Sequence, residues 1–219
     1  MTALIFANGI MAPGTDLTTL LQQADLVIAA DGGANHCSGL GITPDILIGD
    51  LDSICPAILK AFEQKEVEIH RHPKRKNATD LELALDLAAQ KGAHTIWLIG
   101  ALGGRWDMSL ANIMLAAGDK YKDTRIFLRE RDCFIRILHP GTVYTINGMP
   151  GQKVSFLPLK GDVRGVDLDG FEYPLVRHTV PFGSTLGVSN IQKEKEASVH
   201  HTEGTLLCIV FDKKSHSPH

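Results

Sequence analysis

The sequence changes its pattern at about residue 130, and this change limits the possible folds more than any other feature. Before it, short apolar runs alternate with segments of helical periodicity. After it, short alternating segments are separated by turns such as Asn147-Gly148 and Asp169-Gly170. The first pattern predicts an α/β domain whose mostly parallel sheet is covered by helices, and the second an all-β sandwich. We therefore expect two domains, residues 1–132 and 133–219.

Each expected element has a local signal. Apolar runs predict strands over Leu4–Ala7, Leu26–Ala30, Ile46–Ile48, Val67–His70, Thr95–Ile99 and Arg125–Leu128. Helices are expected over Asp16–Gln23, Ser53–Glu63 with Ser53 as cap, a segment opened by the Thr79/Glu82 capping box, and Leu110–Ala117. Strands of the second domain are expected among the short alternating segments from Phe134 to Phe211, such as Thr142–Ile146, Lys153–Leu157 and Leu206–Phe211. A frayed polar tail is expected over Lys213–His219.

The composition favours a small-molecule partner. The net charge of the 219 residues is only −3, so the chain has no basic field to hold nucleic acid or an anionic membrane. The sequence shows neither a signal peptide nor an apolar run that could span a bilayer. The four cysteines form no CxxC pair, which favours reduced thiols and a cytoplasmic location. The histidines fall in no metal-ligand spacing, and we expect them on the surface or in the core.

Acidic residues follow two of the predicted strands. Leu26–Ala30 runs into Asp31, and Ile46–Ile48 is followed by Asp50 and Asp52. The carboxyl ends of parallel strands meet at one edge of a sheet, and if the chain stays extended Asp50 and Asp52 point to the same side. Asp80, in the first turn of a later helix, would join Asp50 and Asp52 as a third carboxylate ligand. Hard oxygen ligands of this kind suit Mg²⁺ bound together with substrate phosphates.

Cations and glycines accompany these acids. Lys74, Arg75 and Lys76 precede Asp80, and Arg105 follows a pair of glycines. Gly32-Gly33 and Gly103-Gly104 provide loops whose N–H groups can reach phosphate oxygens. Taken singly, each feature also has a purely structural interpretation: a turn at Asp31, helix caps at the other aspartates, a solvated loop at the lysines. The joint placement at successive strand ends favours a phosphate site, although neither a Walker A loop nor a GxGxxG motif is present.

In this order, the motifs resemble those of the thiamine pyrophosphokinase family over nearly the whole chain. They are Asp31-Gly32-Gly33-Ala34-Asn35, Gly49-Asp50-Leu51-Asp52-Ser53, Thr79-Asp80-Leu81-Glu82, Gly103-Gly104-Arg105-Trp106-Asp107 and Gly183-Ser184-Thr185-Leu186-Gly187-Val188-Ser189-Asn190. The resemblance implies a nucleotide-binding α/β domain followed by a β-sandwich, and a homodimer that binds thiamine between its subunits. Two positions depart from the family pattern, Met108 after the GGRxD aspartate and Asn77 before the TD pair.

The resemblance also implies a role for each motif residue. Magnesium would be held by Asp50, Asp52 and Asp80, and the catalytic residues would be Asp80, Arg105 and Asp107. We assign ATP binding to Asp31, Gly32, Asn35, Lys76, Gly103, Gly104 and Arg105. Ser189 and Asn190 would contact thiamine.

The reaction implied by this family is the transfer of pyrophosphate from ATP to the hydroxyl of thiamine, with AMP as the leaving group and Mg²⁺ as cofactor. Two alternatives stay open at this point. A pyrophosphokinase for a hydroxymethyl pterin would use the same acids, and a non-catalytic protein could bind thiamine diphosphate or a nucleotide as a signal. Three carboxylates around one ion are more than binding alone requires, which favours an enzyme.

Overall fold

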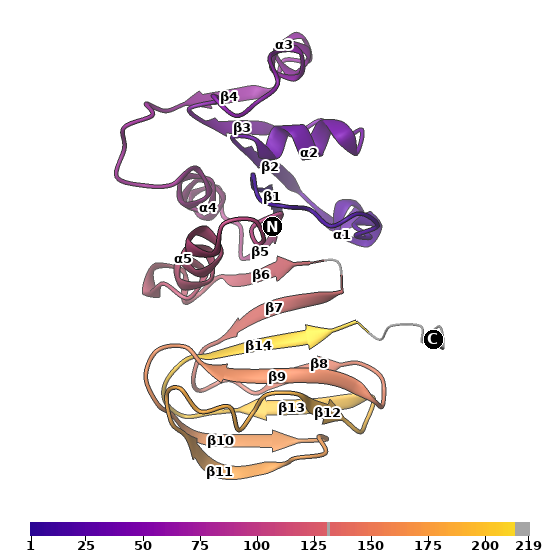
Figure 1. Ribbon diagram of the computed structural model, residues 1–219, viewed down its shortest axis with the longest axis vertical. Coiled ribbons are helices and arrows are strands. Elements are labelled where there is room, and N and C mark those ends of the chain that lie inside the picture. The colour runs from indigo at the N-terminus through magenta and orange to yellow at the C-terminus, as the bar shows by residue number, and fades with distance from the viewer. Residues whose placement is uncertain (131, 213–219) are drawn as a thin grey trace. The chain divides into compact units, whose positions relative to one another are not determined.

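The computed structural model describes residues 1–130 and 132–212. The chain divides into two compact units, Met1–Arg131 and Asp132–His219 (Figure 1). The polar tail that was expected to fray lies outside the described residues. Each unit has its own buried apolar cluster.

The first unit is built on six parallel strands, in the spatial order β6-β5-β1-β2-β3-β4. They are β1 (Thr2–Phe6), β2 (Leu26–Ala30), β3 (Ile46–Gly49), β4 (Glu68–Arg71), β5 (Thr95–Ile99) and β6 (Arg125–Arg129). The order reverses at β1, which pairs with β2 on one side and β5 on the other. In open α/β sheets, such a reversal opens a crevice at the carboxyl ends of the strands, where ligands bind.

Helices cover this sheet on both faces, with α4 and α5 on one side and α1 and α2 on the other (Figure 1). The helices are α1 (Thr18–Gln23), α2 (Gly33–Gly39), α3 (Pro56–Gln64), α4 (Asp80–Gln90) and α5 (Trp106–Ala116), followed by a 3₁₀ turn at Asp119–Tyr121. The apolar strands pack their side chains under these helices, in a core that includes Leu4, Phe6, Ala29, Leu47, Phe62 and Ile99. The mostly parallel sheet with helices predicted from the sequence is confirmed.

Local sequence features mark where three of the helices begin. Thr79 caps α4 by accepting a hydrogen bond from the backbone of Glu82, as the capping-box pattern predicts. The expected cap at Ser53 is wrong, because α3 begins at Pro56 with Cys55 in the N-cap position. Helix α5 begins at Trp106, earlier than expected, because Gly103 and Gly104 complete the turn after β5 and leave the chain free to enter the helix there.

Within the second unit the strands pair antiparallel in the orders β12-β9-β14-β7 and β11-β10-β13-β8, which form two sheet layers. Their strands are β7 (Cys133–Leu138), β8 (Tyr144–Asn147), β9 (Gln152–Pro158), β10 (Val163–Asp169), β11 (Leu175–Val180), β12 (Asn190–Gln192), β13 (Glu196–His200) and β14 (Leu206–Phe211). Residues of both sheets share one buried cluster, which includes Phe156, Val166, Val199 and Val210. A core enclosed between two sheets is the β-sandwich predicted for this part of the chain.

The longest helices in the described part of the chain, α4 and α5, have 11 residues each. No helix there is long and apolar enough to cross a membrane.

Candidate active site

A cavity of about 680 Å³ lies in the first unit at the carboxyl edge of the sheet. Its lining comes from the loops after β1, β2, β3, β4 and β5 and from the starts of α4 and α5. The side chains and backbone that line it include Asn8, Gly9, Ile10, Asp31, Asp50, Asp52, Lys74, Lys76, Thr79, Asp80, Gly103, Gly104, Arg105, Met108 and Asn112. The cavity therefore occupies the crevice that the reversal of strand order creates at β1.

Three aspartates gather at this edge, and we call Asp31, Asp50 and Asp52 the acidic triad. One carboxylate oxygen from each lies within 4.8 Å of the others. The premise that the chain stays extended between Asp50 and Asp52 is wrong, because Leu51 has φ +64° and turns the backbone. The two carboxylates still converge, and the amide of Asp52 donates a hydrogen bond of 3.2 Å to Asp50 Oδ1. Asp31 also has a left-handed φ of +47°, a conformation that non-glycine residues hold only when their surroundings enforce it.

Asn35 of helix α2 fixes the loop that carries Asp50 and Asp52. Its Nδ2 donates to the carbonyl of Ser53 at 2.9 Å, and its Oδ1 accepts from the amide of Cys55 at 3.0 Å. Helix α2 was not expected, because its sequence has no apolar periodicity. The structure uses the predicted nucleotide-binding residue Asn35 to hold the acidic loop in place.

Asp80 lines the same cavity but lies outside the acidic triad. Lys76 Nζ lies 3.0 Å from Asp80 Oδ1 and 3.9 Å from Asp50 Oδ2, as an ion pair at the first turn of α4. Gly49 separates Asp80 from Asp31: its φ is +141°, and a Cβ there would lie 2.8 Å from Asp80 Oδ1 and 3.2 Å from Asp31 Cβ. The structure thus groups Asp50 and Asp52 with Asp31, and pairs Asp80 with a lysine.

Lys74 forms a second, more exposed ion pair at the mouth of the cavity. Its Nζ donates to Asp52 Oδ2 at 2.5 Å while 79% of its side chain is exposed. The hydrogen bond from Lys74, with a further one from Ser53, lowers the pKa of Asp52 below its ordinary value. Asp52 is therefore ionised at neutral pH, as a metal ligand must be.

Arg105 and Asp107 form an exposed ion pair at the start of α5. Arg105 Nη2 contacts Asp107 Oδ2 at 2.5 Å, and this bond is the main cause of a lowered pKa at Asp107. Arg105 lines the cavity, whereas Asp107 is not among its lining residues in the described part of the chain. Gly103 and Gly104 both have positive φ, and the amide of Gly103 donates to Ser109 Oγ at 3.1 Å. The Gly103 amide is therefore already hydrogen-bonded within the loop.

Sequence reasoning missed the loop after β1, which contributes Asn8, Gly9 and Ile10 to the cavity. A Cβ at Gly9 would lie 2.3 Å from the carbonyl oxygen of Gly100, so this loop and the loop after β5 touch through backbone. The predicted residue Gly32 packs in the same way, with its absent Cβ 2.1 Å from Asn8 Oδ1. The signal was present in the sequence, since Asn8 and Gly9 directly follow an apolar strand just as Asp31 does.

Ser189 and Asn190 belong to the second unit, at the start of β12. Asn190 is buried, its Oδ1 accepts from the amides of Tyr173 and Ile191, and its Nδ2 donates to the carbonyl of Tyr173. Ser189 has φ +60°, and its amide donates to Ser155 Oγ at 3.0 Å. The hydrogen bonds of Asn190 therefore fix the backbone next to the exposed residue Ser189.

The cavity combines a group of carboxylates with cations from Lys74, Lys76 and Arg105. Carboxylate oxygens within 4.8 Å of one another suit a hard divalent cation, and the surrounding lysines and arginine suit phosphate oxygens. This arrangement can bind a polyphosphate together with a metal ion and stabilise negative charge that develops on a transferred group.

Comparison with known proteins gives the same division of the chain. The family model described as "Thiamin pyrophosphokinase, catalytic domain" matches residues 17–128, and "Thiamin pyrophosphokinase, vitamin B1 binding domain" matches residues 142–206. The chain is 31% identical to the thiamine pyrophosphokinase of Bacillus subtilis over 194 residues, which cover 89% of this chain and 91% of the relative. It is 27% identical to thiamine pyrophosphokinase 1 of Arabidopsis thaliana, over 97% of this chain and 87% of the relative.

Solved structures agree. The crystal structure of the Bacillus subtilis thiamine pyrophosphokinase superposes with a TM-score of 0.85 at 30% identity, covering 97% of this chain and all of the other. A thiamin pyrophosphokinase from Geobacillus thermodenitrificans gives a TM-score of 0.84 at 28% identity, covering 98% and 99% of the two chains. Both the fold and the order of the two units are thus shared with these proteins.

Proposed function

Because this chain belongs to the thiamine pyrophosphokinase family, we propose that it transfers the pyrophosphoryl group of ATP to the hydroxyl of thiamine, giving thiamine diphosphate and AMP. The observation that carries this proposal is the acidic triad, which lies in a cavity at the crevice of the α/β unit. The match to a vitamin B1 binding domain over residues 142–206 favours thiamine over a hydroxymethyl pterin as acceptor. The cluster of carboxylates and cations favours catalysis over simple binding of a signal molecule.

The residues at the cavity fit a bound Mg²⁺ ion. Three carboxylates whose oxygens lie within 4.8 Å of one another are the hard donors this ion prefers, and the lowered pKa of Asp52 keeps that ligand ionised. We assign the ion to Asp50 and Asp52, with Asp31 as the third ligand in place of the expected Asp80. When bound, the ion would neutralise charge on the phosphates of ATP.

The chain's own cations complete the neutralisation of charge. Lys76 and Arg105 both line the cavity, and we assign them to the phosphates of ATP together with the loops of Gly32 and Gly104. Fixed cations that meet charge as it develops on the transferred group lower the barrier without reorganisation. Two of the predicted catalytic residues are carboxylates that could accept the proton of the hydroxyl: Asp80 lines the cavity, and Asp107 holds Arg105. We therefore assign proton acceptance to Asp80 and the orientation of Arg105 to Asp107.

For the second unit we propose that Ser189 contacts thiamine and that Asn190 holds the backbone of this contact in place. The buried amide of Asn190 supports this division, because its oxygen and nitrogen already bond to the backbone of Tyr173. In line with the family resemblance, we also propose a cytoplasmic homodimer. Light scattering at several protein concentrations tests the oligomeric state.

Incubation of the purified protein with ATP, Mg²⁺ and thiamine tests the proposed reaction. Chromatography should show thiamine diphosphate and AMP in equal amounts, and both should disappear when a chelator removes the metal. ADP with thiamine monophosphate would instead indicate transfer of a single phosphoryl group. A parallel incubation with a hydroxymethyl pterin addresses the alternative acceptor, and preferential use of that alcohol would contradict the assignment to thiamine.

A further inference from the structure

Two successive residues of helix α2 hold loops that follow different strands. Asn35 holds the acidic loop after β3. The next residue, His36, points about 100° further around the helix and reaches the loop after β1, where its Nε2 donates to the carbonyl oxygen of Gly9 at 2.8 Å. A carbonyl oxygen can only accept, so the imidazole carries a proton on Nε2. His36 is half-buried and, in the described part of the chain, is not among the residues that line the cavity.

Gly9 connects this histidine to the loop after β5 through both of its backbone groups. Its carbonyl accepts from His36, and its amide donates to the carbonyl of Gly100 at 2.7 Å. The amide of Ile10 then donates to the carbonyl of Leu102 at 3.2 Å. The imidazole also lies against the second loop directly, since a Cβ at Gly100 would lie 3.5 Å from His36 Cδ2. His36 therefore contacts the two loops at the point where they meet.

The side chain of Ile10 extends these contacts to the two glycines before Arg105. A Cβ at Gly103 would lie 3.2 Å from Ile10 Cβ, and a Cβ at Gly104 would lie 3.6 Å from Ile10 Cδ1. Ile10 therefore packs over the backbone of the glycine pair. The loop that presents Arg105 to the cavity rests on the loop after β1, which His36 holds from behind.

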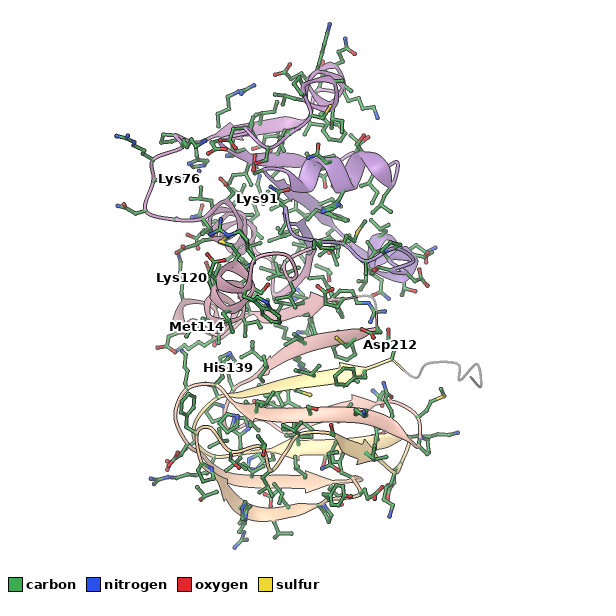
Figure 2. All side chains as sticks on the ribbon, in the orientation of Figure 1. Lys76, Lys91, Met114, Lys120, His139 and Asp212 are labelled. Carbon is green, nitrogen blue, oxygen red and sulfur yellow. The ribbon has the colours of Figure 1, made fainter. Side chains whose placement is uncertain are left out.

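We propose that His36 is a positioning residue for the nucleotide. Its hydrogen bond to Gly9 fixes the loops after β1 and β5 in the arrangement that receives the phosphates, without contact between the imidazole and the ligand. This inference rests on the assignment of Gly104 and Arg105 to ATP under the proposed function. Lys76, the other cation assigned to the phosphates, comes from the connection between β4 and α4 (Figure 2), so loss of the histidine bond should weaken nucleotide binding without abolishing it.

Binding of α,β-methylene-ATP tests the proposal without turnover, because a methylene group replaces the oxygen at the bond that the proposed transfer breaks. Isothermal titration calorimetry with excess Mg²⁺ and no thiamine gives the Kd. His36→Phe keeps a ring of similar size but removes the N–H donor, and it should raise the Kd roughly tenfold. His36→Gln places an amide N–H near the position of Nε2 and should bring the Kd back to within about twofold of the native value.

Two further variants control for folding and for the helix. His36→Asn has an amide that is one methylene shorter and does not reach Gly9, so it should bind the nucleotide as weakly as His36→Phe, and it replaces that variant if the phenylalanine prevents folding. Ser38→Ala, at an exposed position of the same helix, should keep the native Kd. In the transfer assay the KM for thiamine should stay unchanged in all of these variants, because the imidazole acts on the loops assigned to ATP.

Equal nucleotide affinity in the native protein, His36→Phe and His36→Asn would overturn the proposal. A His36→Gln variant that binds as weakly as His36→Phe would also overturn it, because the side-chain N–H would then not be the cause. A parallel rise in the KM for thiamine would replace positioning by a general structural role. If the native protein itself did not bind the analogue, the assignment of this cavity to ATP would fail together with the inference.

Discussion

Each unit of the chain uses an asparagine amide to hold a loop, and the surroundings of the two amides differ. In the first unit, Asn35 bonds to the backbone of Ser53 and Cys55, and the loop it holds presents Asp50 and Asp52 to a cavity. In the second, Asn190 is buried with 2% of its surface exposed and bonds to the backbone around Tyr173. The first amide orders charged groups that line the cavity, and the second bonds to backbone N–H and C=O groups of Tyr173, between strands β10 and β11. The same kind of hydrogen bonding therefore orders an acidic loop beside a cavity in one unit and a buried strand end in the other.

The largest expected effect comes from removing a carboxylate of the first unit. Asp52→Ala should lower kcat/KM for thiamine roughly 1,000-fold or more, because one charged ligand is lost from the acidic triad. The product assay measures this loss, and circular dichroism should show an intact fold. Asp123→Ala, at an exposed aspartate outside the cavity lining, is the matched control and should keep its activity. Near-normal turnover in Asp52→Ala would contradict the assignment of the site.

In the second unit, we expect the largest effect of a substitution on the free energy of unfolding. Asn190→Ala removes three hydrogen bonds of a buried side chain and leaves the amide and carbonyl of Tyr173 without this partner, at a cost of about 2–4 kcal/mol. Hydrogen exchange of strand β12 measures the change. Asn147→Ala, at an exposed asparagine of strand β8, is the control and should shift the stability by less than about 0.5 kcal/mol. Unchanged protection of β12 in Asn190→Ala would mean that its amide does not hold this backbone.

A buried histidine makes the second unit sensitive to acid. His201 has no exposed surface, and burial lowers its pKa from 6.5 to about 4. Between these values the unfolded chain binds a proton that the folded chain does not, so the contribution to stability is complete above pH 6.5 and falls as the pH drops toward 4. At 1.36 kcal/mol per pKa unit, the loss approaches about 3 kcal/mol.

Hydrogen exchange of strands β13 and β14 measures this loss of stability in the second unit. Tryptophan fluorescence would report on the first unit instead, because Trp97 and Trp106 both lie there. His201→Phe should flatten the slope between pH 6.5 and 4, and His178→Phe, at an exposed position of β11, should leave it unchanged. An equal slope in the native protein and in His201→Phe would assign the acid sensitivity to other groups.

The sequence predicts the framework of both units because the framework depends on local patterns. Apolar runs mark the parallel strands, and the Thr79 capping box marks the start of α4. Helix α2 was not predicted because its seven residues show no apolar periodicity. Its position depends on a contact that the sequence does not reveal, since Gly33 packs directly on the carbonyl of Phe6. Strand β11 also lacks a local signal, because four consecutive residues of it are exposed and the strand shows no alternation of buried and exposed side chains.

The sequence predicts which aspartates lie near the cavity, but not which of them come close enough together to share a metal ion. The rule that strand ends meet at one edge places Asp31, Asp50, Asp52 and Asp80 near one cavity, and the structure agrees. The rule does not say which carboxylates come within 4.8 Å of one another, because that depends on the turn at Leu51, on Gly49 and on the ion pair of Lys76. These are contacts between segments far apart in the sequence, which no local pattern encodes.

The smallest of the expected effects sharpens the comparison between the two asparagines. Asn35→Ala should raise the Mg²⁺ concentration needed for half-maximal activity about 10- to 100-fold, because the loop with Asp50 and Asp52 loses its two bonds to α2. Saturating Mg²⁺ should restore most of kcat, since the proposed metal ligands Asp50 and Asp52 are still present. Ser38→Ala, at an exposed position of the same helix, should leave the Mg²⁺ requirement unchanged. If Asn35→Ala lowered only thermal stability, with the native Mg²⁺ requirement, both asparagines would have the same structural role and the contrast between the units would fail.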